Sequence, residues 1–186
     1  MAKKPLPTPE QLRQLLRYDP DTGKLFWKER GPEWFTDGKS QPAAVRAKVW
    51  NARYANREAM TSPDGPYLQG SIFDVKHRAH RVAWAVHYGE WPALFVDHVN
   101  CIGTDNRISN LRLATNGQNM SNQGIRADNT SGCKGVSWSR QSQKWDARIK
   151  HAGRQECLGK FTSKEEASAA YQEAAKRLHG KFARIE

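Results

Sequence analysis

Hydrophobic positions recur with two periods along this chain, and the change of period predicts where strands give way to a helix. Apolar and polar residues alternate over 135–140 and 144–150, and with the segment 156–161 and the turn residues between them these segments predict three strands. Helical spacing of apolar residues follows over 167–178, between a capping-box pair, Thr162 and Glu165, and a terminating Gly180. We therefore predict a three-stranded antiparallel sheet covered by one helix.

The alternation also assigns the two faces of this sheet. The helix is expected to cover the apolar face, which holds Val136, Trp138, Trp145, Ala147 and Ile149. The opposite face is polar and basic, with Ser137, Ser139, Asp146, Arg148 and Lys150.

The middle of the chain predicts two short strands and a helix. Residues 94–96 form a strand that leads into Asp97 and His98, and residues 110–113 form a second strand. Thr115 and Gln118 have capping-box spacing, so a helix is expected to start at Thr115. Asn119 then lies in the first turn of that helix.

The N-terminal half is less regular. A helix is expected from Thr8 through Arg17, followed by a turn at 18–23 and a strand at 24–28. Residues 29–66 contain four prolines, and we expect irregular strands and loops there. Residues 72–88 predict a strand and then a helix.

These elements predict four parts in the chain. They are an N-terminal accessory region at 1–66, a core at 67–120, a polar linker at 121–130 and the sheet unit at 131–186. The fold class is α+β.

The charge of the chain indicates an anionic partner. There are 30 Lys and Arg against 19 Asp and Glu, a net charge of +11, and residues 131–186 alone hold 12 basic and 6 acidic residues. A basic protein gains affinity for DNA by displacing counterions from phosphates. Solubility accounts for a surplus of Lys as well.

Other sequence features narrow the class of protein. The chain has no apolar run of the ~20 residues that span a bilayer, and its start lacks the apolar stretch of a signal peptide, so we expect it in the cytoplasm. Its three cysteines never form a Cys-x-x-Cys pair. We therefore expect reduced thiols and no structural zinc.

Asp97, His98, Asn110 and Asn119 are the candidate chemical centre. A carboxylate and an amide can hold a divalent cation, and an imidazole can take a proton from water. An isolated Asp-His pair more often forms a turn or a surface hydrogen bond, and Asn-rich loops are common turns. The spacing of all four residues on a strand, strand and helix favours a nuclease centre.

This pattern resembles the ββα-metal motif of HNH endonucleases, in the Asp-His-Asn-Asn form found in phage homing endonucleases. The resemblance implies that Asp97 and Asn119 bind Mg²⁺ or Mn²⁺, that His98 is the general base, and that Asn110 braces the loop that aims the imidazole. Asn106 matches a polar position of the same loop. Double-stranded DNA would be cut to 5′-phosphate and 3′-hydroxyl ends, with activity falling below about pH 6.5 because the base must be unprotonated.

Arg81 follows His80 in a pair that related HNH proteins carry just upstream of the centre. The resemblance implies a grip on the scissile backbone. A helical Arg that packs its stem is an equal alternative.

The C-terminal unit resembles the Apetala-two/ERF DNA-binding domain, in the version fused behind phage HNH nucleases. The supporting motifs are Ser131-Gly132-x-Lys134-Gly135-Val136, Trp145-x-Ala147-x-Ile149, Leu158-Gly159-x-Phe161 and Leu178-His179-Gly180. The resemblance places DNA contacts at Lys134, Ser137, Ser139, Arg148, Lys150 and Gln155. A solvated sheet face that binds another protein is the alternative.

The sequence therefore predicts a metal-dependent DNA endonuclease docked by its C-terminal sheet. Two alternatives from other classes stay open. One is a DNA-binding transcriptional regulator that keeps the nuclease fold without catalysis, and the other is an accessory factor for phage DNA packaging.

Overall fold

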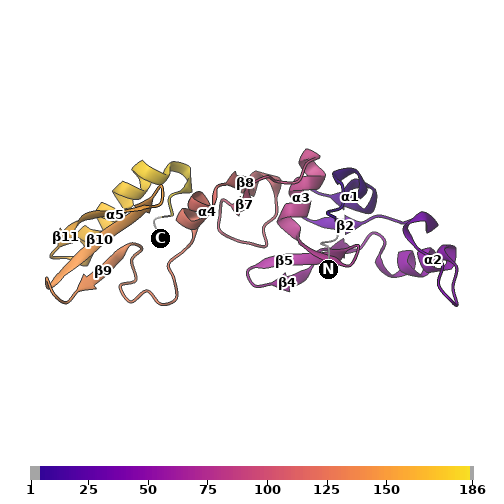
Figure 1. Ribbon diagram of the computed structural model, residues 1–186, viewed down its shortest axis with the longest axis horizontal. Coiled ribbons are helices and arrows are strands. Elements are labelled where there is room, and N and C mark those ends of the chain that lie inside the picture. Colours follow the sequence, from indigo (N-terminus) through magenta and orange to yellow (C-terminus); the bar gives the residue numbers. More distant parts are fainter. Residues whose placement is uncertain (1–4, 185–186) are drawn as a thin grey trace. The chain divides into compact units, whose positions relative to one another are not determined.

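The computed structural model describes residues 5–184, which form two compact units (Figure 1). The first unit ends at Leu113 and the second begins at Ala114. Each unit has several small elements and its own hydrophobic core. The described part of the chain is a mixed α and β protein with small antiparallel sheets and the helices α1 to α5.

The first unit opens with helix α1 (Pro9–Leu15), which begins at a capping box of Thr8 and Gln11. The predicted extension of this helix to Arg17 is wrong. Strand β1 (Leu16–Tyr18) starts directly after the helix and pairs with β2 (Leu25–Trp27), which also pairs with β3 (Glu58–Ala59). The sheet satisfies the backbone of residues 16–18, so pairing with β2 ends the helix early.

A helix occupies part of the region for which the sequence predicted irregular structure. After a short 3-10 turn, η1 (Pro32–Trp34), helix α2 runs over Ala43–Tyr54. Ala47 is the residue that α2 buries, whereas Val45 and Val49 are exposed. The helix therefore has no apolar stripe of the kind that reveals helices in a sequence.

Aromatic side chains attach α2 to the strands. The Arg30 guanidinium lies 3.9 Å from the ring centre of Trp50 and 4.7 Å from that of Trp27. Burial lowers the pKa of Arg30 to about 10. These cation-π contacts replace the aliphatic packing that α2 lacks.

A second sheet of the first unit has the order β4-β5-β6 and precedes helix α3 (Ala79–Tyr88). Its strands are β4 (Ser62–Asp64), β5 (Tyr67–Ile72) and β6 (Val75–Arg78). The predicted helix within 72–88 corresponds to α3, whereas the strand predicted before it is interrupted by a turn at Phe73 and Asp74 that separates β5 from β6. Helix α3 ends at Gly89, which has a φ of 80°.

Two short strands complete the first unit. Strand β7 (Phe95–His98) pairs with β8 (Leu111–Ala114), and the 3-10 turn η2 (Ile108–Asn110) lies between them in sequence. Both strands lie within two residues of their predicted positions. Val96 and Leu111 join the hydrophobic core formed by α1, α3 and the small sheets.

The second unit consists of α4 (Asn116–Asn122), a sheet of order β11-β10-β9, helix α5 (Lys164–His179) and the 3-10 turn η3 (Gly180–Phe182). Its strands are β9 (Val136–Ser139), β10 (Lys144–His151) and β11 (Arg154–Phe161). The antiparallel three-stranded sheet with one helix agrees with the prediction. Helix α4 has the predicted capping box of Thr115 and Gln118.

The start of α5 differs from the prediction by one residue. Ser163 and Glu166 form the capping box, not Thr162 and Glu165. Both pairs have the same spacing, so the sequence does not discriminate between them. With the helix starting after Ser163, its buried residues pack on the sheet. These helix residues are Ala167, Tyr171 and Ala175, and they lie in one core with Val136, Ala147 and Ile149.

One predicted core position of this sheet is largely exposed. Trp138 is 45% exposed, although its ring meets that of Trp145 edge-on with centroids 5.1 Å apart. Helix α5 packs on the part of the face that holds Ala147 and Ile149.

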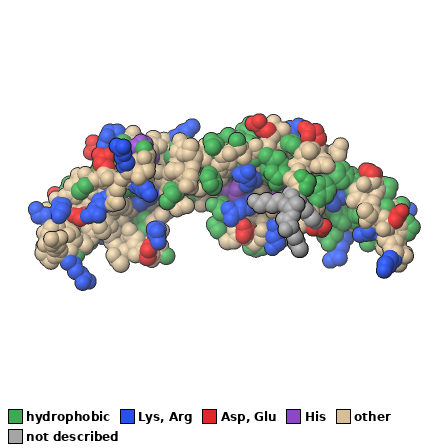
Figure 2. Space-filling view, viewed as in Figure 1, with side chains coloured by type: hydrophobic (Ala, Val, Ile, Leu, Met, Phe, Trp, Pro, Cys, Tyr) green, Lys and Arg blue, Asp and Glu red, His purple; other side chains and the backbone are tan. Residues whose placement is uncertain are grey.

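Figure 2 shows Lys and Arg side chains spread over the surface of the second unit.

Candidate functional site

Strand β7 carries Asp97 and His98, and both residues are buried, with exposed fractions of 6% and 4%. On the neighbouring strand β8, Arg112 forms an ion pair with Asp97. Its Nε and Nη2 atoms each lie 2.8 Å from Asp97 Oδ2. The antiparallel pairing of β7 and β8 brings these two charges together.

Asn106 orients the imidazole of His98. The His98 Nε2 atom lies 3.1 Å from Asn106 Oδ1, and both residues are buried. An amide oxygen only accepts hydrogen bonds, so Nε2 carries the proton and Nδ1 is the basic nitrogen. Burial lowers the pKa of His98, while the bond to Asn106 and the negative charge of Asp97 oppose that shift. The net direction is downward.

Two further rings pack against His98. The ring of Tyr67 lies 5.8 Å from it and that of His80 lies 5.2 Å away, edge-on. His80 is buried, and its Nδ1 makes no hydrogen bond within the described structure. Burial, and then the nearby positive charge of His98, lower the pKa of His80 to about 3. His80 is therefore neutral in the working pH range of most enzymes.

Asn110 connects the two ends of the loop between β7 and β8. Its Nδ2 donates to Asn100 Oδ1 at 2.9 Å and to the carbonyl oxygen of Asp105 at 2.7 Å, while its Oδ1 accepts from the Asn100 amide at 3.0 Å. Asp105 in turn pairs with Arg107, which lowers the pKa of its carboxyl to about 2. Asn110 thus braces the loop that contains Asn106.

The N-terminal turn supports this loop from the other side, which the sequence did not reveal. The Tyr18 hydroxyl donates to the carbonyl oxygen of Asn106 at 2.7 Å, and the Ile108 amide donates to that of Pro20 at 3.1 Å. Gly23 has a φ of 74°, and a Cβ there would lie 2.4 Å from the Arg107 nitrogen. The turn at 18–23 was predicted, but no local pattern indicates what it packs against.

Asn119 lies in α4 and so belongs to the second unit. Its backbone amide donates to the carbonyl oxygen of Thr115 at 2.9 Å. The approach of Asn119 to Asp97, and with it the ββα-metal arrangement, stays a prediction.

The donor set is suitable for a hard divalent cation. No group of three or more His, Cys, Asp and Glu side chains with metal-binding geometry occurs among residues 5–184. The expected ligands are instead one carboxylate, Asp97, and one amide, Asn119, and Mg²⁺ commonly completes such a shell with water and phosphate oxygens. A carboxylate has about four acceptor positions, so the Arg112 pair on Oδ2 is compatible with a cation on Asp97.

Arg81 contacts backbone on the segment that precedes β7. Its Nη1 and Nη2 donate to the carbonyl oxygens of Leu94 at 3.3 Å and Pro92 at 3.1 Å. Burial lowers its pKa. These bonds give Arg81 a structural role, and a contact with DNA stays a prediction.

Lys134 also has local partners. Its Nζ donates to the carbonyl oxygens of Ser121 and Gln123, at the C-terminal end of α4. The lysine thus stabilises that helix end, where carbonyl groups carry partial negative charge.

Three of the remaining predicted DNA contacts, Ser137, Arg148 and Gln155, line one hollow on a face of the C-terminal sheet. The register places Ser137 beside Asp146, Arg148 beside Cys157, and Lys150 beside Gln155, while Ser139 pairs with Lys144. The Arg148 guanidinium also lies 3.0 Å from Asp146 Oδ2. Whether this face binds DNA stays a prediction.

A family model described as HNH endonuclease matches residues 77–121, which include Asp97, His98, Asn110 and Asn119. The chain is also similar to Protein 3.8 of Escherichia phage T7, at 33% identity over 111 residues, or 58% of this chain and 89% of that protein. No solved structure matches the chain. The C-terminal sheet lies outside the family match, and its resemblance to the Apetala-two/ERF domain stays a prediction.

Proposed function

Since this chain belongs to the HNH endonuclease family, with the HNH domain at residues 77–121, we propose that it is a divalent-metal-dependent DNA endonuclease. Its products would carry 5′-phosphate and 3′-hydroxyl ends. Whether it nicks one strand or cuts both depends on how many copies act together at one site. A phage relative suggests that it acts in the cytoplasm of a host cell.

The contact between His98 and Asn106 is the observation that carries this proposal. With Nε2 held by the Asn106 oxygen, the imidazole keeps one tautomer and offers Nδ1 to a water molecule. Asn110 keeps the loop in shape, so the imidazole is oriented before substrate binds.

The second role in the proposed centre is to bind the metal ion. Asp97 and Asn119 would hold the cation, with Mg²⁺ or Mn²⁺ as the expected ion. When bound there, a divalent ion stabilises negative charge that develops on the phosphate. The residues of this chain orient the phosphate and receive the proton at His98 Nδ1.

DNA docking is the second part of the proposal. The uncovered face of the C-terminal sheet is polar and carries Arg148 and Lys150, and antiparallel sheets of this size fit a DNA major groove. The second unit would thus add phosphate contacts to those near the cut.

A DNA-binding protein without catalysis is the second candidate, and two observations favour it. His98 is only 4% exposed, so water and phosphate must gain access to Nδ1 for catalysis. Asp97 is already neutralised by Arg112. A scaffold that keeps the nuclease fold for stability would show the same two features.

A cleavage assay separates the candidates. Supercoiled plasmid is incubated with wild type, His98→Ala or His87→Ala, in Mg²⁺, in Mn²⁺ and in chelator. Loss of a general base lowers the rate by about 10²- to 10⁴-fold, so we expect metal-dependent cutting by wild type and its loss in His98→Ala. His87 is exposed and lies outside the proposed centre, so His87→Ala should cut like wild type.

Each result decides between the proposals. Equal cutting by wild type and His98→Ala would remove His98 from its role. Salt-sensitive DNA binding with no cutting by any form would establish the non-catalytic candidate. Ligation of the products to a 3′-hydroxyl acceptor reports the 5′-phosphate ends.

A further inference from the structure

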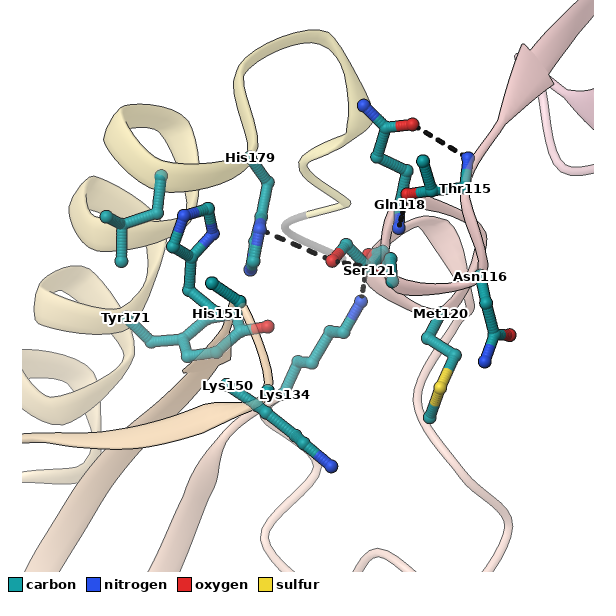
Figure 3. A pocket seen from close by; sticks show the side chains of 14 residues that line it. Thr115, Asn116, Gln118, Met120, Ser121, Lys134, Lys150, His151, Tyr171 and His179 are labelled. Carbon is teal, nitrogen blue, oxygen red and sulfur yellow. Dashed lines mark hydrogen bonds between the residues drawn. The ribbon is translucent and has the colours of Figure 1, made fainter. Parts of the chain in front are cut away.

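The second unit contains a groove of about 620 Å³ formed entirely by its own elements (Figure 3). One wall is α4, which contributes Asn116 and Met120. The opposite wall is the end of β10 and the turn after it, from Lys150 to Gly153. Helix α5 closes the groove with Tyr171 and His179. This volume is typical of ligand-binding clefts.

The lining of the groove has one sign of charge. None of the fourteen residues that line it is acidic, whereas Lys134, Lys150, His151 and His179 all face it. Acidic residues occur elsewhere in the same unit, for example in the first turn of α5. The groove is therefore selectively free of carboxylates, which favours an anionic occupant.

Hydrogen bonds fix the walls of the groove relative to one another. Lys134 Nζ donates to the carbonyl oxygens of Ser121 at 2.5 Å and Gln123 at 2.6 Å, and His179 Nδ1 lies 3.3 Å from Ser121 Oγ. Figure 3 shows the bonds of Ser121 with His179 and Lys134 side by side. They attach α4 to α5 and to the loop before β9, so the groove exists before any ligand arrives.

Basic side chains crowd together at one end of the groove. The rings of His151 and His179 lie 5.5 Å apart. Burial lowers the pKa of His179 first, and the charges of His151 and Lys134 lower it further. His179 is therefore uncharged at neutral pH and offers hydrogen bonds, while Lys134 and Lys150 carry the positive charge of the groove.

We propose that this groove binds the phosphodiester backbone of DNA, and that it adjoins the uncovered face of the sheet, with which it shares Lys150. This inference rests on the proposed function, in which DNA is the substrate. The amide of Asn116, the ammonium of Lys150 and the imidazoles are donors suited to phosphate oxygens. Helix α4 carries Asn119 as well, so the groove directs the backbone along the helix expected to hold the cation.

Two substitutions on opposite walls test the groove. Lys150→Gln removes a charge from the sheet wall. Asn116→Asp adds a carboxylate of nearly equal shape to the α4 wall, and a carboxylate in the first turn stabilises a helix, so this variant should fold at least as well as wild type. Asn116 lies outside the sheet, so its effect separates the groove from the sheet face.

The matched control is Lys176→Gln. Lys176 is an exposed lysine of α5 in the same unit, and it does not line the groove. Its replacement changes the net charge of the protein by the same amount as Lys150→Gln.

The measurement is the affinity of the full chain for a fluorescent DNA duplex in chelator, over a series of salt concentrations. We expect several-fold weaker binding for both groove variants. For Lys150→Gln, the slope of log affinity against log salt should fall by about one, the value for one lost phosphate contact. Lys176→Gln should bind like wild type.

The outcomes distinguish the groove from the nuclease. If Asn116→Asp binds like wild type, or if Lys176→Gln loses as much affinity as Lys150→Gln, the groove proposal is refuted even when the protein cuts DNA. If the groove variants lose affinity but wild type never cuts with Mg²⁺ or Mn²⁺, the groove stands and the nuclease proposal falls.

Discussion

At the scale of single residues, the centre depends on how the imidazole of His98 is held. The Asn106 oxygen sets its tautomer, and the rings of Tyr67 and His80 limit its movement. Burial lowers the pKa of His98, so a base at this position stays unprotonated to a lower pH than an ordinary histidine. The acid limit of about pH 6.5 expected from the sequence for a solvated histidine therefore shifts downward.

Replacing Asn106 tests the positioning of His98. Asn106→Ala removes the acceptor for Nε2–H, and loss of such an orienting partner costs roughly 10- to 100-fold in activity. Asn106→Asp keeps an acceptor oxygen, so it should restore the tautomer and raise the pKa of His98. Nitrogen NMR of the imidazole reports the tautomer without any cleavage assay. An unchanged tautomer in Asn106→Ala would contradict the assignment.

His80 makes the stability of the first unit depend on pH. Its folded-state pKa is about 3, against an ordinary value of 6.5, so between these values the unfolded chain binds more protons. The free energy of unfolding therefore falls as the pH drops from 6.5 toward 3, by at most about 1.4 kcal/mol per pH unit. Above pH 6.5 the His80 imidazole is neutral in both the folded and the unfolded chain, so it adds no pH dependence to the free energy of unfolding.

Urea unfolding of His80→Phe at several pH values checks this dependence. The substitution keeps an aromatic ring and removes the titration, so its stability should change less with pH than that of wild type. His87→Phe replaces an exposed histidine and is the control. Parallel pH curves for wild type and His80→Phe would refute the assignment.

At the scale of elements, helix starts follow local rules except where two candidates coincide. The capping box of α4 occurs at the position that the sequence predicts, and α1 begins after the predicted Thr8. At α5 the chain offers Thr162 with Glu165 and Ser163 with Glu166, and tertiary packing of Ala167 and Tyr171 on the sheet selects the second. The local sequence therefore limits the start of α5 to two positions, and the burial of apolar residues on the sheet decides between them.

The cap of α5 can be tested by alanine substitution. Ser163→Ala removes the acceptor for the Glu166 amide and should cost about 1 kcal/mol of stability in the second unit. Thr162→Ala removes an exposed hydroxyl and should cost clearly less. Chemical denaturation of both variants measures the difference. A larger loss in Thr162→Ala would place the helix start where the sequence predicted it.

At the scale of the whole molecule, two separate cores imply two units of stability. One core is built around Leu12, Leu15 and Val82, and the other around Ile149, Ala147 and Tyr171. No helix in the described part of the chain is long and apolar enough to cross a membrane.

Substitution in one core should leave the other unit intact. Ile149→Ala creates a cavity in the second core and should cost about 2–5 kcal/mol there. Amide exchange should accelerate in β9 to β11 while α3 keeps its protection. Val82→Ala is the reciprocal variant and should accelerate exchange in the first unit while β9 to β11 keep their protection. Simultaneous acceleration in both units by either variant would show that they unfold together.

The sequence by itself determined the features that depend on neighbouring residues. The capping pair of α4, the strand positions of β9 and β10, and the spacing of Asp97, His98 and Asn110 are readable within short windows, because hydrogen bonds and side-chain direction repeat with fixed periods. The roles expected of these residues came from the family resemblance, because their spacing alone does not specify a reaction.

Tertiary structure alone decided the features that depend on distant residues. Helix α2 is held by aromatic and cation-π contacts rather than an apolar stripe, so no periodicity predicts it. The support of Asn106 by Tyr18, the ion pair of Asp97 with Arg112, and the walls of the basic groove join segments far apart in the chain. Such contacts exist only after the chain has folded, because burial and proximity, not local sequence, create them.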